Sequence, residues 1–72
     1  MTDKIKLEYL LKKAKVSKKD YAKSLGISLQ ALYNKLNNLT EFKQAEISAT
    51  CKLLNLSTKE RDEIFFAHKV DE

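Results

Sequence analysis

Hydrophobic residues recur every three or four positions along most of this chain, in five segments separated by short polar stretches. Such spacing is typical of α-helices that bury one face, because about 3.6 residues make one turn. In the first segment, positions i, i+3, i+4 and i+7 are Leu7, Leu10, Leu11 and Ala14. The pattern predicts a compact all-α bundle.

Residues that favour helix starts precede these segments. Ser57 with Glu60 has the spacing of a capping box, and Ser17 with Asp20 resembles one. The fourth segment places Ile47, Cys51 and Leu54 on one face. The sequence therefore predicts five helices: one starting at Thr2 or Asp3, one from Ser17 to about Leu25, one from Ser28 to about Leu36, one from about Lys43 to Leu54, and one from Ser57 to about His68.

The chain contains one glycine and no proline, and the glycine lies between the second and third predicted helices. A helix commonly ends at a residue in the left-handed conformation, which glycine adopts without a steric penalty. Gly26 therefore predicts a sharp turn, after which Ile27 returns to the core and Ser28 caps the next helix. Ala22 lies on the inner face of the second helix, where a larger side chain would hold the third helix away. We expect a helix–turn–helix corner here.

This corner resembles the helix–turn–helix of the Cro and lambda-repressor-like family of bacterial and phage regulators. The motif's small residue and turn glycine correspond to Ala22 and Gly26. Its buried aliphatic positions correspond to Leu25, Ile27 and Leu32. Where the family often has an apolar residue this chain has Lys35, and Leu36 takes its place. The resemblance covers residues 3–66 and implies a five-helix, lambda-repressor-like DNA-binding fold with the helix–turn–helix in helices two and three.

The third helix has a polar face opposite Leu32 and Leu36. Its positions i, i+3, i+4 and i+7 are Gln30, Tyr33, Asn34 and Asn37. Amide side chains pair with adenine in the major groove, and a tyrosine ring packs on thymine methyl groups or reaches a phosphate. We expect contacts to DNA bases from Ser28, Gln30, Tyr33 and Asn34, with an ordinary polar surface as the alternative. Leu29 either joins the core or faces the DNA.

Contacts to DNA phosphates are expected at both ends of this corner. The start of the second helix offers unpaired backbone N–H groups and a positive dipole end beside cationic side chains. The candidates there are Ser17, Lys18 and Lys19. Further candidates flank the end of the third helix: Lys35, Asn37, Asn38 and Lys43.

The net charge of +4 is unevenly distributed along the chain. Residues 1–36 contain nine lysines and three acidic residues, whereas residues 37–72 contain five basic and seven acidic residues. The N-terminal half thus carries +6 and the C-terminal half −2. A basic half favours contact with a polyanion such as DNA, although a solvated lysine-rich surface is the other interpretation.

The chain makes a single domain, residues 1–72, with no basis for catalysis. His68 and Cys51 are the only residues of their kinds, and neither has a partner at a useful spacing for a metal or a nucleophile. We expect Cys51 in the core and His68 in a last helical turn. The lone cysteine, with no signal peptide or membrane-length hydrophobic run, favours a cytoplasmic protein. No membrane partner, metal, cofactor or small-molecule ligand is expected.

Phe65 and Phe66 are neighbours near the end of the fifth predicted helix. Adjacent helical positions point about 100° apart, so both rings cannot face one small core. We expect one ring on the surface, where it supports a homodimer. The alternative is that a kink at the helix end takes both rings into the core.

These features together predict a sequence-specific regulator of transcription that binds a double-stranded DNA operator as a homodimer. No ligand-sensing or cleavable domain follows the DNA-binding unit, so the resemblance favours a Cro-like repressor of a phage or other mobile element. The alternative is a protein-interaction module on the same fold, such as a small antitoxin-like or anti-repressor protein. A salt titration of DNA binding separates the two classes.

Overall fold

The computed structural model describes residues 1–66, which fold into five α-helices. The helices are α1 (Lys4–Lys13), α2 (Lys18–Leu25), α3 (Leu29–Leu36), α4 (Gln44–Leu54) and α5 (Thr58–Phe65). The all-α class and the order of the helices are therefore confirmed. α5 ends earlier than the sequence predicts, and His68 lies outside the described residues.

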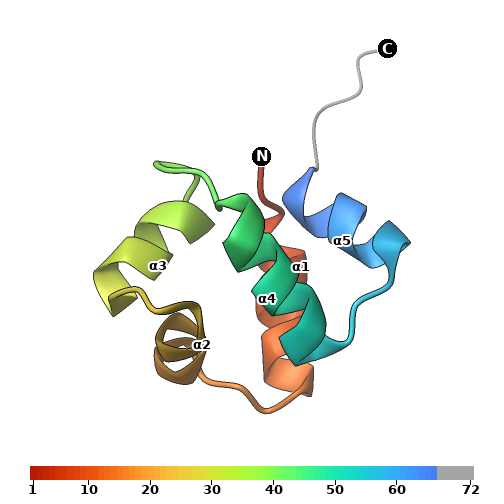
Figure 1. Ribbon diagram of the computed structural model, residues 1–72, viewed down its shortest axis with the longest axis horizontal. Helices are drawn as coiled ribbons and strands as arrows, with labels where there is room; N and C mark the ends of the chain where they lie inside the picture. Colours follow the sequence, from red (N-terminus) through yellow and green to blue (C-terminus); the bar gives the residue numbers. More distant parts are fainter. Residues whose placement is uncertain (67–72) are drawn as a thin grey trace.

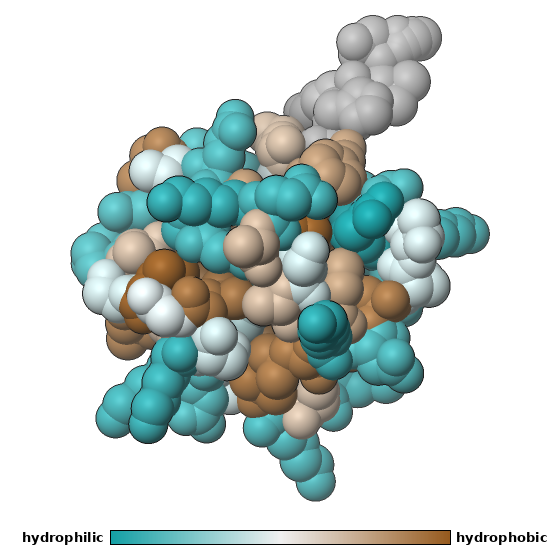
Figure 2. Space-filling model, viewed as in Figure 1, coloured by the Kyte–Doolittle hydropathy of each residue, from teal (hydrophilic) through white to brown (hydrophobic). Residues whose placement is uncertain are grey.

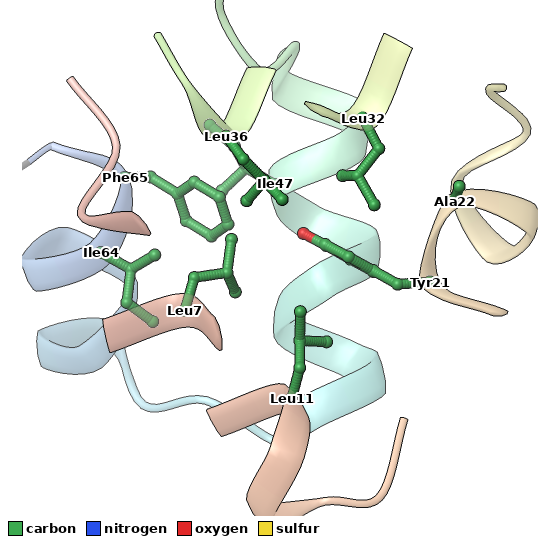
Figure 3. Close-up of a cluster of buried hydrophobic side chains, with 9 residues drawn as sticks. All are labelled: Leu7, Leu11, Tyr21, Ala22, Leu32, Leu36, Ile47, Ile64 and Phe65. Carbon is green, nitrogen blue, oxygen red and sulfur yellow. The ribbon is translucent and has the colours of Figure 1, made fainter. Parts of the chain in front are cut away.

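The helices pack around α4, which lies at the centre of Figure 1 with α2 and α3 on one side and α5 on the other. α2 packs against α3 and α4, and α5 packs against α1 and α4. Every helix contributes to one hydrophobic core, drawn in Figure 3 and made of Leu7, Leu11, Tyr21, Ala22, Leu32, Leu36, Ile47, Ile64 and Phe65. Cys51 packs against this core and is partly buried, as expected.

Side chains cap most of the helices as their sequence positions predict. Asp3 Oδ1 accepts a hydrogen bond from the backbone N–H of Lys6, which identifies Asp3 as the cap of α1. Serines 17, 28 and 57 accept from the third residue beyond them at the starts of α2, α3 and α5. Each such cap stabilises a helix by about 1 kcal/mol, because it satisfies an N–H group that has no partner inside the helix.

Ala14 is exposed, although the sequence pattern places it on the buried face of the first helix. The reason is that α1 ends at Lys13, and the chain turns at Lys15, which has φ +61°. Each connection between helices contains one residue with a positive φ, and the other three are Gly26, Asn38 and Asn55. Of these four residues, the sequence predicts a left-handed conformation only for Gly26.

Lys15 gives a test of strain at the α1–α2 connection. A left-handed backbone destabilises a residue with a Cβ by about 1–2 kcal/mol, and glycine lacks this penalty but gains freedom in the unfolded chain. Lys15→Gly should therefore raise the free energy of unfolding by about 0.5–1 kcal/mol in urea denaturation. Lys13→Gly, at a helical position, should instead lower it by about 1 kcal/mol. A loss in both variants would contradict the strain.

The two adjacent phenylalanines separate as expected, since Phe65 is 4% exposed and Phe66 is 49% exposed. The Phe65 ring meets Phe42 edge-on, with centroids 5.1 Å apart and planes at 72°. The Phe66 ring lies 5.9 Å from the guanidinium carbon of Arg61. The structure therefore excludes burial of both rings, and it leaves the expected homodimer as a proposal.

A buried polar chain links α2 to α4 within this core. Thr50 Oγ1 donates to the backbone carbonyl of Glu46 at 2.8 Å, so the Tyr21 hydroxyl, 2.6 Å from Thr50 Oγ1, is the donor in that contact. Burial raises the pKa of Tyr21 to about 12. In Figure 3 the Tyr21 hydroxyl points toward α4 from the α2 side.

The N-terminal residues are fastened to two distant segments. The backbone N–H of Asp3 donates to the carbonyl of Ile64 at 2.7 Å. Thr2 donates its backbone N–H to Asn38 Oδ1 at 2.8 Å and accepts from Asn38 Nδ2 at 3.1 Å. These bonds hold the start of α1 against α5 and the α3–α4 connection.

Candidate nucleic-acid interface

The α2–α3 corner, Lys18–Leu36, forms as its sequence predicts. Gly26 ends α2 with φ +73°, in the left-handed region. Ile27 then donates its backbone N–H to the carbonyl of Ala22 at 3.0 Å, which turns the chain back across the end of α2. Ala22 is buried, so its small side chain lets α3 approach α2 closely. The turn between the two eight-residue helices is only Gly26, Ile27 and Ser28.

The outer face of α3 carries the polar residues expected to read DNA bases. Gln30, Tyr33 and Asn37 are exposed, and Asn34 is half-buried. Gln30 Nε2 donates to Asn34 Oδ1 at 3.1 Å, so the two amides lie side by side. Each amide keeps further donors and an oxygen acceptor for another molecule. The arrangement suits recognition of a base edge by paired hydrogen bonds.

Ser28 and Leu29 extend this face at the start of α3. Ser28 is exposed, and its Oγ accepts from the backbone N–H of Ala31 while its own hydrogen stays available to another acceptor. Leu29 is 39% exposed, which answers the question left open by the sequence: its side chain faces outward. A hydrophobic side chain beside two amides suits a thymine methyl group.

The start of α2 lies beside the middle of α3. Lys18 Nζ is 5.9 Å from the centroid of the Tyr33 ring and 2.7 Å from Glu8 Oε2. The hydrogen bond that Lys18 donates to the Glu8 carboxylate raises the pKa of Lys18, so this ammonium group stays charged. Lys19 is exposed and makes no ion pair with residues 1–66, and Ser17 Oγ caps the helix. The ammonium group of Lys19 is therefore open to an anion, whereas that of Lys18 is shared with the Glu8 carboxylate.

The residues after α3 are partly engaged with the start of the chain. Asn37 Oδ1 accepts from Lys4 Nζ at 2.9 Å, and the Asn38 amide is paired with the backbone of Thr2. Lys43 is exposed at the start of α4. Among these expected phosphate contacts, Asn37 and Lys43 are accessible, whereas the Asn38 side chain already holds the N-terminal backbone.

The structure does not place Lys35 on the surface. Its Nζ lies 3.1 Å from Glu46 Oε1 and donates to the carbonyl of Glu41 at 3.0 Å. The same group is 5.9 Å from the centroid of the Phe42 ring. We therefore leave Lys35 out of the candidate interface. The sequence signal that could have revealed this pair is Glu46, an acidic residue in the first turn of the next helix and three residues after Lys43.

Two other kinds of site are expected to be absent, a membrane span and a metal site. No helix within residues 1–66 is long and apolar enough to cross a membrane. In the same range, no three residues among His, Cys, Asp and Glu gather where they could hold a metal ion.

Helices α1–α5, with α2 packed on α3, define a small all-α protein. The chain belongs to the family described as Protein of unknown function (DUF739), whose model matches residues 7–68. The match includes the whole α2–α3 corner and both helices that follow it. Neither the curated proteins nor the solved structures contain a match to this chain.

Proposed function

We propose that this protein is a sequence-specific DNA-binding regulator of transcription, with α2 and α3 acting as a helix–turn–helix of the lambda-repressor-like kind. The observation that carries the proposal is the left-handed Gly26, which turns α3 so that Gln30 and Asn34 stand together on its exposed face. The resemblance to Cro-like regulators adds a role as a repressor of a phage or other mobile element.

In this proposal α3 enters the major groove and reads base edges from its N-terminal half. Gln30 and Asn34 pair with adenine N6 and N7, and Ser28 bonds either an acceptor or a donor at the groove edge. Tyr33 and Leu29 pack on thymine methyl groups beside them. The preferred half-site is therefore rich in A·T pairs.

Phosphates lie at the two ends of the α2–α3 corner in the same arrangement. Ser17, Lys18 and Lys19 stand at the start of α2, where the first backbone N–H groups and the helix dipole favour an anion. Asn37 and Lys43 reach the DNA backbone beyond the C-terminal end of α3. These contacts fix the position of the protein on the duplex without reading its sequence.

Selection of bound duplexes from a random pool tests the proposal directly. The wild-type chain should enrich a defined, two-fold symmetric sequence, and its affinity should fall steeply with salt because phosphate contacts release counterions. Binding without salt dependence, or enrichment of no sequence, would rule out this function.

Single substitutions should separate base reading from phosphate binding. Gln30→Ala and Asn34→Ala should each weaken binding to the selected site by about 1–3 kcal/mol and leave binding to a scrambled duplex nearly unchanged. Lys18→Ala should weaken both and lower the salt slope by about one unit. Glu8→Gln is the matched control, because it removes the carboxylate that shares Lys18 and should strengthen binding to both duplexes. Equal losses on both duplexes for all three alanine variants would contradict the assignment.

We further propose that the protein binds its operator as a homodimer. A single recognition helix covers few base pairs, and two-fold dimers double the contact with half-sites about 34 Å apart or a multiple of that distance. Phe66 borders a hollow of about 130 Å³ whose lining includes the apolar residues Met1, Phe42 and Phe65 and the polar residues Thr2, Asn38 and Glu41. An exposed aromatic ring at the edge of a hollow with polar and apolar lining residues suits a self-complementary contact.

Phe66→Ala should weaken self-association and operator binding while leaving helix content and the melting temperature of the monomer nearly intact. The control is Phe65→Ala, which removes a buried ring and should destabilise the fold by about 3–5 kcal/mol. Sedimentation measures association, and circular dichroism measures folding. Unchanged association of Phe66→Ala would place the dimer contact elsewhere.

Binding to another protein is the second candidate function, and one observation favours it. Ile5 and Tyr9, one turn apart on α1, are 79% and 61% exposed. In the view of Figure 2, hydrophobic and hydrophilic areas alternate over the surface without one continuous hydrophobic face. If this α1 surface binds another protein, the Ile5→Ser/Tyr9→Ser double variant should keep its DNA binding. Loss of DNA binding in this double variant would instead connect the α1 surface to the DNA interface.

A further inference from the structure

Lys35 and Glu46 form the only ion pair among the described residues with both side chains buried, at 9% and 10% exposure. The Lys35 ammonium group has two fixed acceptors, Glu46 Oε1 at 3.1 Å and the carbonyl of Glu41 at 3.0 Å. Glu46 Oε1 is itself held, because it accepts the backbone N–H of Lys43 at 2.8 Å. The backbone at the start of α4 therefore holds the Glu46 carboxylate in place independently of α3.

The other buried residues of α3 are Leu32 and Leu36. Hydrophobic contacts are non-directional, so two leucines hold α3 against the core without setting its rotation sharply. A buried ion pair is directional, and its best-attested role in proteins is to fix one arrangement among several of similar stability. The ion pair of Lys35 therefore restrains the rotation of α3, which the contacts of the two leucines do not.

Rotation of α3 matters because its outer face is opposite its buried face. A side chain ends about 6 Å from the helix axis, so a rotation of about 20° moves it by about 2 Å. Hydrogen bonds to base edges tolerate only a few tenths of an ångström around 2.9 Å. A small rotation would therefore break paired contacts by Gln30 and Asn34 while leaving phosphate contacts by flexible lysines in place.

α2 is tied to the same part of α4. Tyr21 of α2 bonds Thr50, which lies one turn after Glu46 on α4. Thr50 in turn bonds the backbone carbonyl of Glu46, the residue whose carboxylate holds Lys35. Both helices of the corner thus have polar anchors between Glu46 and Thr50. The anchor of α2 and the anchor of α3 are thus separate bonds, one turn apart on α4.

We infer that Lys35 is a positioning residue for base recognition: its buried pair with Glu46 sets the rotation of α3 and so determines sequence preference without touching DNA. This inference rests on the proposed function. It also assigns Lys35 a role different from the phosphate contact expected from the sequence.

The test is the double variant Lys35→Met/Glu46→Gln. Methionine keeps the unbranched stem beside Phe42, and glutamine keeps an oxygen for the Lys43 N–H, so both volumes and the net charge are retained. The ratio of affinities for the selected and a scrambled duplex should fall by about tenfold or more, as expected for loss of one paired base contact. Affinity for the scrambled duplex and the salt slope should stay unchanged. A slope lower by one unit would show instead that Lys35 contacts a phosphate.

Tyr21→Phe is the matched control, since it removes the polar anchor of α2 and keeps both acceptors of the Lys35 ammonium group. Tyr21→Phe should lower the stability of the fold. At temperatures well below the melting temperature of this variant, the ratio of affinities for the selected and the scrambled duplex should stay unchanged. A folded double variant with the wild-type ratio would overturn the inference. If the double variant does not fold, Lys35→Arg decides, because its planar head keeps the charge but cannot reproduce the same acceptor geometry. An unchanged ratio in Lys35→Arg would also overturn the inference.

Amide chemical shifts separate this inference from the proposed function. In the double variant, the backbone amides of Gln30 and Asn34 should shift, while those of α2 stay in place. If the wild-type chain prefers no duplex, the proposed function fails, and the shifts still report whether Lys35 positions α3. Unchanged α3 shifts would refute the positioning role whatever the DNA result.

Discussion

Replacing Gly26 with valine should lower the free energy of unfolding by about 1–3 kcal/mol. Gly26 has φ +73°, a region in which a β-branched residue is a strong outlier. Apart from the residues next to Gly26 in sequence, a Cβ at this position meets no atom within 4 Å, so the expected loss comes from the backbone conformation. Urea denaturation followed by circular dichroism measures the effect, which reports the backbone strain of the α2–α3 turn alone.

Gly26→Asn is the matched control for this prediction. Asparagine visits the left-handed region more readily than other residues with a Cβ, as Asn38 and Asn55 do in this chain. Its loss should stay below about 1 kcal/mol. Equal free energies of unfolding for Gly26→Val and Gly26→Asn would contradict a left-handed conformation at the α2–α3 turn.

Raising the pH from about 10 to about 12 should remove about 2–3 kcal/mol of stability through Tyr21. Burial is the main cause that raises the pKa of Tyr21 from about 10 to about 12. The unfolded chain therefore loses this proton near pH 10, while the folded chain holds it. The stabilisation is complete below pH 10 and disappears as the pH rises through the folded pKa. Denaturation at a series of alkaline pH values measures the loss.

Tyr21→Phe isolates this effect from the titration of the lysines, which both proteins share. At neutral pH the variant should be less stable by about 1 kcal/mol, because it leaves Thr50 without the hydroxyl that donates to it. Its stability should then fall less between pH 10 and 12 than that of the wild type. Parallel curves for the two proteins would show that Tyr21 does not govern alkaline unfolding.

Much of this fold could be predicted from local sequence signals. Ser17, Ser28 and Ser57 each cap a helix at the expected position, because a hydroxyl three residues before an N–H group needs no tertiary partner. Gly26 adopts the left-handed turn for an equally local reason. The exposed amides of the candidate interface follow from the periodicity of α3, once Leu32 and Leu36 are assigned to the core.

The features that escaped prediction depend on partners distant in sequence. Lys35 is buried because Glu46, in the first turn of α4, and the Glu41 carbonyl meet its ammonium group. Local propensity favours a lysine in solvent and contains no information on such a partner. Lys15 takes a positive φ because the chain must turn sharply into α2, which overrides the preference of its own side chain.

The hydrogen bonds of Thr2 and Asp3 have a consequence for the order of folding. Thr2 pairs with a residue 36 positions away, and Asp3 pairs with Ile64 in the last described helix. Contacts between residues this far apart form late, because a long loop must close first. During synthesis on the ribosome, α1 emerges first but gains these contacts only after α5 has followed it. We therefore expect α1 to be the last helix to become protected from hydrogen exchange in the nascent chain.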